Sequence, residues 1–219
     1  MTGEDRTTWK EGSRMIFIGI CGASGSGKST LAHALEERLG SNRCLVLQQD
    51  AYYRDHPDLT FEQRVKLNYD EPEIFDHDLL LEDICQLERG GGISRKVYNF
   101  SEHRRDDRPD EIILPRDVVI LEGIHTFHDR RLTEKMFLKL YMQVEPDICL
   151  LRRIERDIVE RGRDIQGIST QYLNSVKPMF DKYIRNYISD ADVIVANGGK
   201  NARIVDILAG YVQDALRGE

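Results

Sequence analysis

The chain has 219 residues, enough for one large α/β domain with a substantial core, and its 31 basic and 38 acidic residues give a formal net charge of −7. This balance argues against a general nucleic-acid binder, and no apolar run approaches the ~20 residues of a membrane-spanning helix. Four scattered cysteines without a Cys-x-x-Cys pair predict buried thiols in a reducing compartment, so we expect a cytoplasmic protein without disulfides.

A phosphate-binding loop is the first feature along the chain, after a polar segment at residues 1–14 that we expect to be flexible. An apolar strand predicted at residues 15–21 leads into the pattern G-x-x-x-x-G-K-[S/T], and a predicted helix at 28–39 follows. The loop glycines allow backbone N–H groups to surround a polyphosphate, and the helix adds its positive end. The pattern predicts a nucleoside triphosphate site made of Gly22, Ala23, Ser24, Gly25, Ser26, Gly27, Lys28, Ser29 and Thr30.

Two side chains of this loop have specific expected roles. Lys28 can reach the β- and γ-phosphates, and the Ser29 hydroxyl can ligate Mg²⁺. The alternative interpretation is a glycine-rich turn that merely joins a strand to a helix.

Four further apolar runs predict strands, with helical patterns between them. The strands are expected at residues 43–49, 118–121, 138–144 and 193–196, and the helices at 76–89, 146–161, 170–187 and 201–216. Strands that alternate with helices predict an α/β fold of the P-loop NTPase type, with a five-stranded parallel sheet flanked by helices. Ligands bind such sheets at the carboxyl ends of the strands, so residues that follow strands are candidate site residues.

An inserted β-hairpin is expected at about residues 93–114. Its strands would be 93–100 and 111–114, joined by a highly charged turn at 101–108. The turn is either a solvated loop or part of a substrate lid.

An acidic residue follows each of two predicted strands. Asp50, after the strand at 43–49, is either a general base for an attacking hydroxyl or a turn cap. Glu122, after the strand at 118–121, gives a Walker-B-like pattern and is a candidate Mg²⁺ partner.

Five arginines lie within twelve residues of this acidic chain: Arg152, Arg153, Arg156, Arg161 and Arg163. Because arginine stabilises the charge that develops on a transferred phosphoryl group, the cluster predicts a mobile lid at about residues 153–167, hinged at Gly162. The alternative is a solvent-exposed, salt-bridged helix, in which Asp157 and Arg161 would form an i, i+4 pair.

Two histidines lie three residues apart, next to an acidic residue. His125, His128 and Asp129 could form a metal site, but closed sites need more ligands, and we expect polar surface here.

Several motifs occur together in an order that resembles the uridine–cytidine kinases, which are P-loop nucleoside kinases of pyrimidine salvage. The resemblance covers about residues 15–215 and includes the segments 22–30, 49–53, 68–76, 98–103, 121–124 and 152–164. It implies a single P-loop kinase domain over residues 15–219, in which ATP or GTP phosphorylates the 5′-hydroxyl of uridine, and also of cytidine, with Mg²⁺. It also implies a homo-oligomer, by analogy a tetramer, with no nucleic-acid or membrane partner.

The resemblance assigns roles residue by residue. Asp50 would be the general base and lie near Mg²⁺, which Ser29 and Glu122 would hold, while Lys28 would act on the phosphates. The lid would consist of Arg156, Arg161 and Arg163. The nucleoside would be bound by Asp70 with Arg153 as its partner, by a wall of aromatic side chains, by His103 at the base edge, and by Gln171. The wall would consist of Tyr53, Tyr69, Tyr98 and Phe100, whose alternative role is core packing.

The chain departs from the family pattern at Glu71, Asn99 and His125, and in the charge of residues 101–109. These departures lie on the acceptor side and leave two alternatives open. One is a P-loop kinase for another small hydroxylated acceptor, such as pantothenate or a modified ribonucleoside. The other is a nucleotide-dependent switch, against which the chain lacks the guanine-reading Asn-Lys-x-Asp motif.

Overall fold

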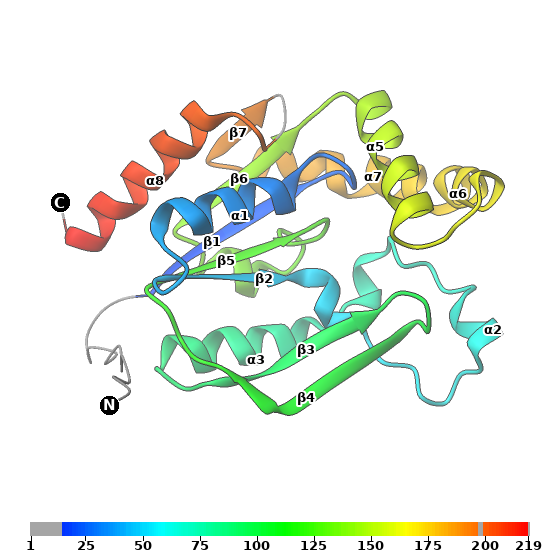
Figure 1. The fold of residues 1–219 in the computed structure, drawn as a ribbon, viewed down its shortest axis with the longest axis horizontal. Helices are drawn as coiled ribbons and strands as arrows, with labels where there is room; N and C mark the ends of the chain where they lie inside the picture. The colour runs from blue at the N-terminus through cyan, green and yellow to red at the C-terminus, as the bar shows by residue number, and fades with distance from the viewer. Residues whose placement is uncertain (1–14, 197–198, 219) are drawn as a thin grey trace.

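A five-stranded parallel sheet forms the centre of the computed structural model, which describes residues 15–196 and 199–218; the flexible segment expected at 1–14 lies outside these ranges. The strand order is β2-β5-β1-β6-β7 (Figure 1). The strands are β1 (Ile16–Gly22), β2 (Cys44–Gln48), β5 (Val118–Gly123), β6 (Leu138–Gln143) and β7 (Val193–Ala196). All five predicted strands are confirmed within one or two residues.

Two hydrophobic cores lie on opposite faces of this sheet, because successive side chains of a strand point to opposite sides. Ile18 of β1 packs in the core with α1 (Lys28–Leu39) and α8 (Ala202–Arg217). Its neighbour Phe17 packs in the other core, which contains α3 (His77–Glu88). The buried stripe of α3 consists of Leu80, Ile84 and Leu87, as the helical spacing predicted.

Short elements complete the connections after the strands. They are the 3₁₀ turns η1 (Gln49–Tyr52) and η2 (Pro72–Ile74) and the short helices α2 (Phe61–Arg64) and α4 (Arg130–Thr133).

The hairpin is a separate two-stranded sheet that lies beside α3 (Figure 1). Its strands are β3 (Ile93–Asn99) and β4 (Arg104–Ile113), so the predicted charged turn at 101–108 is wrong. Most of those charged residues belong to β4, which is largely exposed and pairs its charges along and across the ribbon, as in the Arg95–Glu111 ion pair at 3.2 Å. A largely exposed strand needs no apolar alternation, which is why residues 104–110 were not recognised as part of this strand in the sequence.

The long helix predicted at 170–187 is also wrong. The chain instead forms α6 (Ile165–Gln171), the π-helical turn η3 (Tyr172–Val176), α7 (Lys177–Lys182) and the 3₁₀ segment η4 (Ile184–Asp190). It follows α5 (Pro146–Val159), and Gly162 between α5 and α6 adopts a left-handed φ of 62°.

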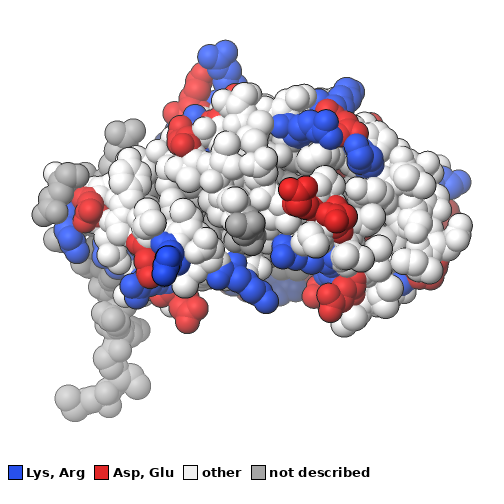
Figure 2. All heavy atoms as spheres, turned by 90° about the horizontal axis from the view of Figure 1, so that it is seen from above, with Lys and Arg blue, Asp and Glu red and all other residues white. Residues whose placement is uncertain are grey.

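The cysteines are unpaired, and Cys21, Cys44 and Cys149 are buried as predicted. Among residues 15–196 and 199–218, no helix is long and apolar enough to span a membrane. On the face drawn in Figure 2, basic and acidic side chains are interleaved between broad uncharged areas. That face therefore carries no continuous basic surface among the residues described.

Candidate active site

The loop between β1 and α1 has the backbone that phosphate binding requires. Gly25 and Gly27 adopt left-handed φ angles of 82° and 92°. A Cβ atom at Gly25 would lie 2.3 Å from the carbonyl oxygen of Cys149 at the start of α5. Side chains other than hydrogen are therefore excluded at Gly25 by both backbone strain and space.

Side chains at the end of this loop make hydrogen bonds within the loop and to the end of β5. The Lys28 Nζ atom donates to the Ala23 carbonyl at 3.0 Å, and the Ser29 hydroxyl donates to Glu122 Oε1 at 2.8 Å. Burial raises the pKa of Glu122, Lys28 lowers it, and the charge of Asp50 raises it further. Two carboxylates and a hydroxyl that gather at a phosphate loop are oxygen ligands of the kind Mg²⁺ prefers, so these residues fit a magnesium ion.

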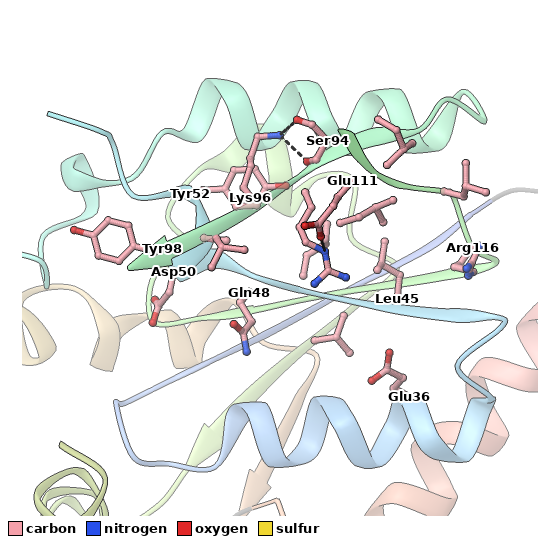
Figure 3. A pocket seen from close by; sticks show the side chains of 18 of the residues that line it. Glu36, Leu45, Gln48, Asp50, Tyr52, Ser94, Lys96, Tyr98, Glu111 and Arg116 are labelled. Carbon is pink, nitrogen blue, oxygen red and sulfur yellow. Dashed lines mark hydrogen bonds and ion pairs between the residues drawn. The ribbon is translucent and has the colours of Figure 1, made fainter. Parts of the chain in front are cut away.

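Asp50 lies in η1, directly after β2, with its carboxylate at one end of the hollow drawn in Figure 3. The N-cap residue of η1 is Gln48 rather than Asp50, so Asp50 does not occupy the capping position of this turn. The carboxylate instead lines the cleft described next.

One cleft brings together every residue expected at the acceptor side and in the lid. It lies beside Ser24 of the phosphate loop, and Ile124 also lines it. The expected residues that line it are Asp50, Tyr53, Tyr69, Asp70, Tyr98, Phe100, His103, Arg153, Arg156, Arg161, Arg163 and Gln171. These residues come from five separate segments of the chain, at 50–53, 69–70, 98–103, 153–163 and 171, which only the fold unites.

Aromatic rings form one wall of the cleft. Tyr53 stacks on Phe75 with ring centroids 4.5 Å apart, and its ring lies 4.8 Å from that of Tyr98. Tyr98 in turn meets Phe100 edge to face at 5.3 Å. Tyr53 and Tyr98 are buried and also line the cleft, so the same side chains pack in the core and form the cleft wall.

Asp70 is a buried carboxylate on the same cleft. Burial raises its pKa, whereas Arg153 and a hydrogen bond from Ser175 at 3.2 Å lower it. The ion-pair partner of Arg153 is Asp157 rather than Asp70. Two hydroxyl groups of a ligand would supply the donors that a buried carboxylate requires.

The lid arginines share one carboxylate. Asp157 is fully buried, and its oxygens lie 2.7 Å from Arg156, 3.4 Å from Arg161 and 3.9 Å from Arg163. Burial raises the pKa of Asp157, but the surrounding arginines together hold it below its usual range. The sequence indicated the pair with Arg161 but missed that Asp157 fixes the whole cluster.

The lid contacts both halves of the site. Arg153 donates to Ser24 of the phosphate loop and to Gln171, each at 3.0 Å, and the Arg161 guanidinium lies 4.0 Å above the ring of Phe100. Arg163 donates to the same Gln171 oxygen at 2.6 Å.

His103 forms the tip of the hairpin and adopts a left-handed φ of 49°. Its ring lies 4.8 Å from that of Tyr69, and its Nδ1 atom is buried without a hydrogen-bond partner in the described chain. Burial, followed by Arg163, lowers the pKa of His103, so the ring is neutral near pH 7 and has both a donor and an acceptor nitrogen.

The expectation that His125 and His128 form polar surface is wrong for His125, which is completely buried. Its ring hydrogen-bonds Tyr187 and the backbone carbonyl of Asp70. No cluster of three or more candidate metal ligands of the His, Cys, Asp and Glu type occurs in the described residues.

We predict that burial of His125 makes the protein less stable in acid. Burial lowers its pKa to about 3, whereas the unfolded chain takes up a proton near pH 6.5. Between these values only the unfolded state gains the proton, so this residue lowers the free energy of unfolding by about 1.4 kcal/mol on going from pH 7.5 to 5.5. Chemical denaturation at both pH values should show a smaller loss for His125→Gln, and equal losses would contradict the prediction.

A larger hollow lies between β2 and the hairpin and ends at the cleft (Figure 3). Asp50, Tyr98 and Phe100 line both spaces. Lys96 anchors the hairpin at the wall of this hollow through its buried ion pair with Asp83 at 2.6 Å.

The chain is similar to known proteins in both sequence and fold. The model of the phosphoribulokinase/uridine kinase family matches residues 17–203. The uridine kinases of Ligilactobacillus salivarius and Geobacillus kaustophilus are 40% and 41% identical, with 94% of this chain and 96% and 97% of theirs covered. Phosphoribulokinase from Rhodobacter spheroides has a similar fold, with a TM-score of 0.62 at 13% identity over 87% of this chain and 74% of that one.

Proposed function

The chain belongs to the phosphoribulokinase/uridine kinase family, and we propose that it transfers the γ-phosphoryl group of ATP to the 5′-hydroxyl of uridine, and also of cytidine. The observation that carries this proposal is the single cleft that joins Asp50, Asp70, His103 and the lid arginines beside Ser24 of the phosphate loop. The two relatives named uridine kinase match along nearly their whole length, which supports the same acceptor.

The donor half of the proposed mechanism lies at the phosphate loop. Its backbone and Lys28 bind the β- and γ-phosphates, and Ser29, Glu122 and Asp50 would hold Mg²⁺. The ion would neutralise phosphate charge. A shallow hollow flanks the loop and has room for the nucleoside part of the donor; its lining includes Thr30, Ala34, Gly199, Lys200 and Ala202.

The acceptor half positions the 5′-hydroxyl between Asp50 and the donor. Asp70 accepts hydrogen bonds from the ribose hydroxyls, and neutral His103 bonds the polar edge of the pyrimidine. Asp50 accepts the 5′-hydroxyl proton as the oxygen attacks. The arginines of the lid stabilise the charge on the transferred group and exclude water, which would otherwise act as an acceptor.

The remaining parts of the proposal come from family analogy: ATP or GTP as donor, a homotetramer, a cytoplasmic location and residues 15–219 as one kinase domain. Unpaired, mostly buried cysteines are consistent with a reducing compartment.

Release of ADP in the presence of different acceptors tests the function. Uridine and cytidine should each stimulate ADP formation from Mg·ATP, and the product should be the 5′-monophosphate by chromatography. Stimulation by pantothenate alone would replace the proposed acceptor, and stimulation by no acceptor would favour a nucleotide switch.

His103→Ala should raise the KM for uridine about 10-fold and change the KM for ATP less than about 2-fold. The substitution removes a buried hydrogen-bonding group at the hairpin tip, and such a bond contributes about 1 kcal/mol or more. Steady-state kinetics with each substrate varied in turn measure both constants. Equal increases in the two constants would show that His103 does not contact the base.

A further inference from the structure

A chain of hydrogen bonds runs behind the acceptor cleft and ends on Asp70. His128 Nδ1 lies 3.1 Å from the Tyr187 hydroxyl oxygen, and the same oxygen lies 3.0 Å from His125 Nδ1. On its other side, His125 Nε2 lies 2.8 Å from the backbone carbonyl oxygen of Asp70. His125 is fully buried, whereas His128 is exposed.

The direction of each hydrogen bond follows from counting donors. A carbonyl oxygen only accepts, so Nε2 of His125 carries the proton and donates to Asp70. Burial keeps this ring neutral, and its Nδ1 atom must therefore accept the Tyr187 proton. The tyrosine oxygen has no second proton, so His128 Nδ1 donates to it.

This chain of hydrogen bonds reaches the backbone carbonyl of Asp70, whereas other groups hold its N–H and its carboxylate. The Asp70 N–H group is held by the Asn68 side chain at 3.1 Å, and the carboxylate accepts a hydrogen bond from Ser175. Within the described chain, His125 is the hydrogen-bond partner of the remaining backbone group, the carbonyl. The orientation of the peptide after Asp70 thus depends on His125.

We propose that His125 is a positioning residue for the acceptor: its Nε2–H tautomer, supported at Nδ1 by the hydrogen bonds to Tyr187 and His128, keeps Asp70 aimed at the ribose hydroxyls. The inference rests on the proposed function for its kinetic consequence, whereas the tautomer is a property of the folded chain alone. The carboxylate of Asp70 contacts the acceptor, and His125 acts only through it.

The tautomer is tested first, by long-range ¹H–¹⁵N correlation spectra of the wild-type protein at pH 7.5. The expected pattern assigns the proton of His125 to Nε2 and the proton of His128 to Nδ1. A His125 proton on Nδ1 would overturn the proposal whatever the substrate is. The same spectrum of Tyr187→Phe should keep the proton on Nε2, because the Asp70 carbonyl still accepts it, but should show a shifted Nδ1 resonance that has lost its hydrogen bond. An unchanged Nδ1 resonance would overturn the role of Tyr187.

Kinetics test the consequence. His125→Leu should raise the KM for uridine about 10-fold, with kcat and the KM for ATP changed less than about 2-fold. His125→Gln should restore most of the affinity, because the terminal amide of Gln can donate from nearly the position of Nε2. Tyr183→Phe is the matched control: the Tyr183 ring packs against His125 at 5.9 Å, and its change should leave all constants unaltered.

The outcomes separate this proposal from the proposed function. Phosphorylation of uridine by wild type with equal KM values for all variants overturns the positioning role and leaves the kinase intact. Equal impairment of the Leu and Gln variants assigns His125 to packing alone and also overturns it. Failure of wild type to phosphorylate uridine removes the proposed function, while the spectra still decide the hydrogen-bond chain.

Discussion

Asp50→Asn is expected to lower kcat with uridine by about 10²- to 10⁴-fold, because an amide cannot accept the proton of the attacking hydroxyl. Asp50 lies at the end of β2, where its carboxylate lines the cleft and is not used to cap η1. The substitution keeps the size of the side chain, so the fold and the phosphate loop should be unaffected. Affinity for ATP, measured without acceptor, should therefore change less than about 2-fold.

Asp58→Asn is the control for this experiment. It makes the same chemical change at an exposed loop position outside the cleft and should retain wild-type turnover. Substantial kcat in Asp50→Asn would remove Asp50 as the base. If excess Mg²⁺ restored the rate of Asp50→Asn, holding the metal would be its main role instead.

Asp157→Asn is expected to reduce both turnover and stability. The buried carboxylate lies within ion-pair distance of Arg153, Arg156, Arg161 and Arg163, and its loss leaves their charges facing one another. Removing one partner of a buried ionic cluster costs roughly 3 kcal/mol. Misplaced lid arginines should lower kcat by about 10- to 100-fold, a fraction of what an arginine finger contributes.

Denaturation curves and steady-state kinetics measure these two effects separately. Asp181→Asn is the matched control, because Asp181 also pairs with basic side chains, Lys177 and Arg185, but at the surface of α7. Exposed ion pairs contribute about 0–1 kcal/mol, so this variant should resemble wild type. Full kcat in a folded Asp157→Asn protein would show that the carboxylate only stabilises α5.

The sequence predicted the sheet and the donor loop because their signals are local. Buried parallel strands are continuous apolar runs, and the glycines around Lys28 have fixed spacing. The first part of β4 was taken as a turn because residues 104–108 are all charged and this strand is largely exposed. The segment at 170–187 was wrongly taken as one helix because its π-helical and 3₁₀ turns keep a nearly helical hydrophobic spacing.

The acceptor side shows a similar limit. Residues such as Asp70 and His103 could be named from the family resemblance, and the structure brings them to one cleft. Contacts between distant segments could not be read from the chain. His125 and Tyr187 are 62 residues apart, and the His125 site looked polar in a sequence that gives no sign of its burial.

The separation of the hairpin from the central sheet has a consequence for how this scaffold can diversify. The phosphate loop, Glu122 and the start of α5 are packed together on the main sheet, with Gly25 against the Cys149 carbonyl. His103 and Tyr98 instead belong to a ribbon that, within residues 15–196 and 199–218, shares no strand pairing with that sheet. If His103 and Tyr98 bind the acceptor as proposed, substitutions in the ribbon can change which acceptor fits while the strands that carry the phosphate loop and Glu122 keep their pairing.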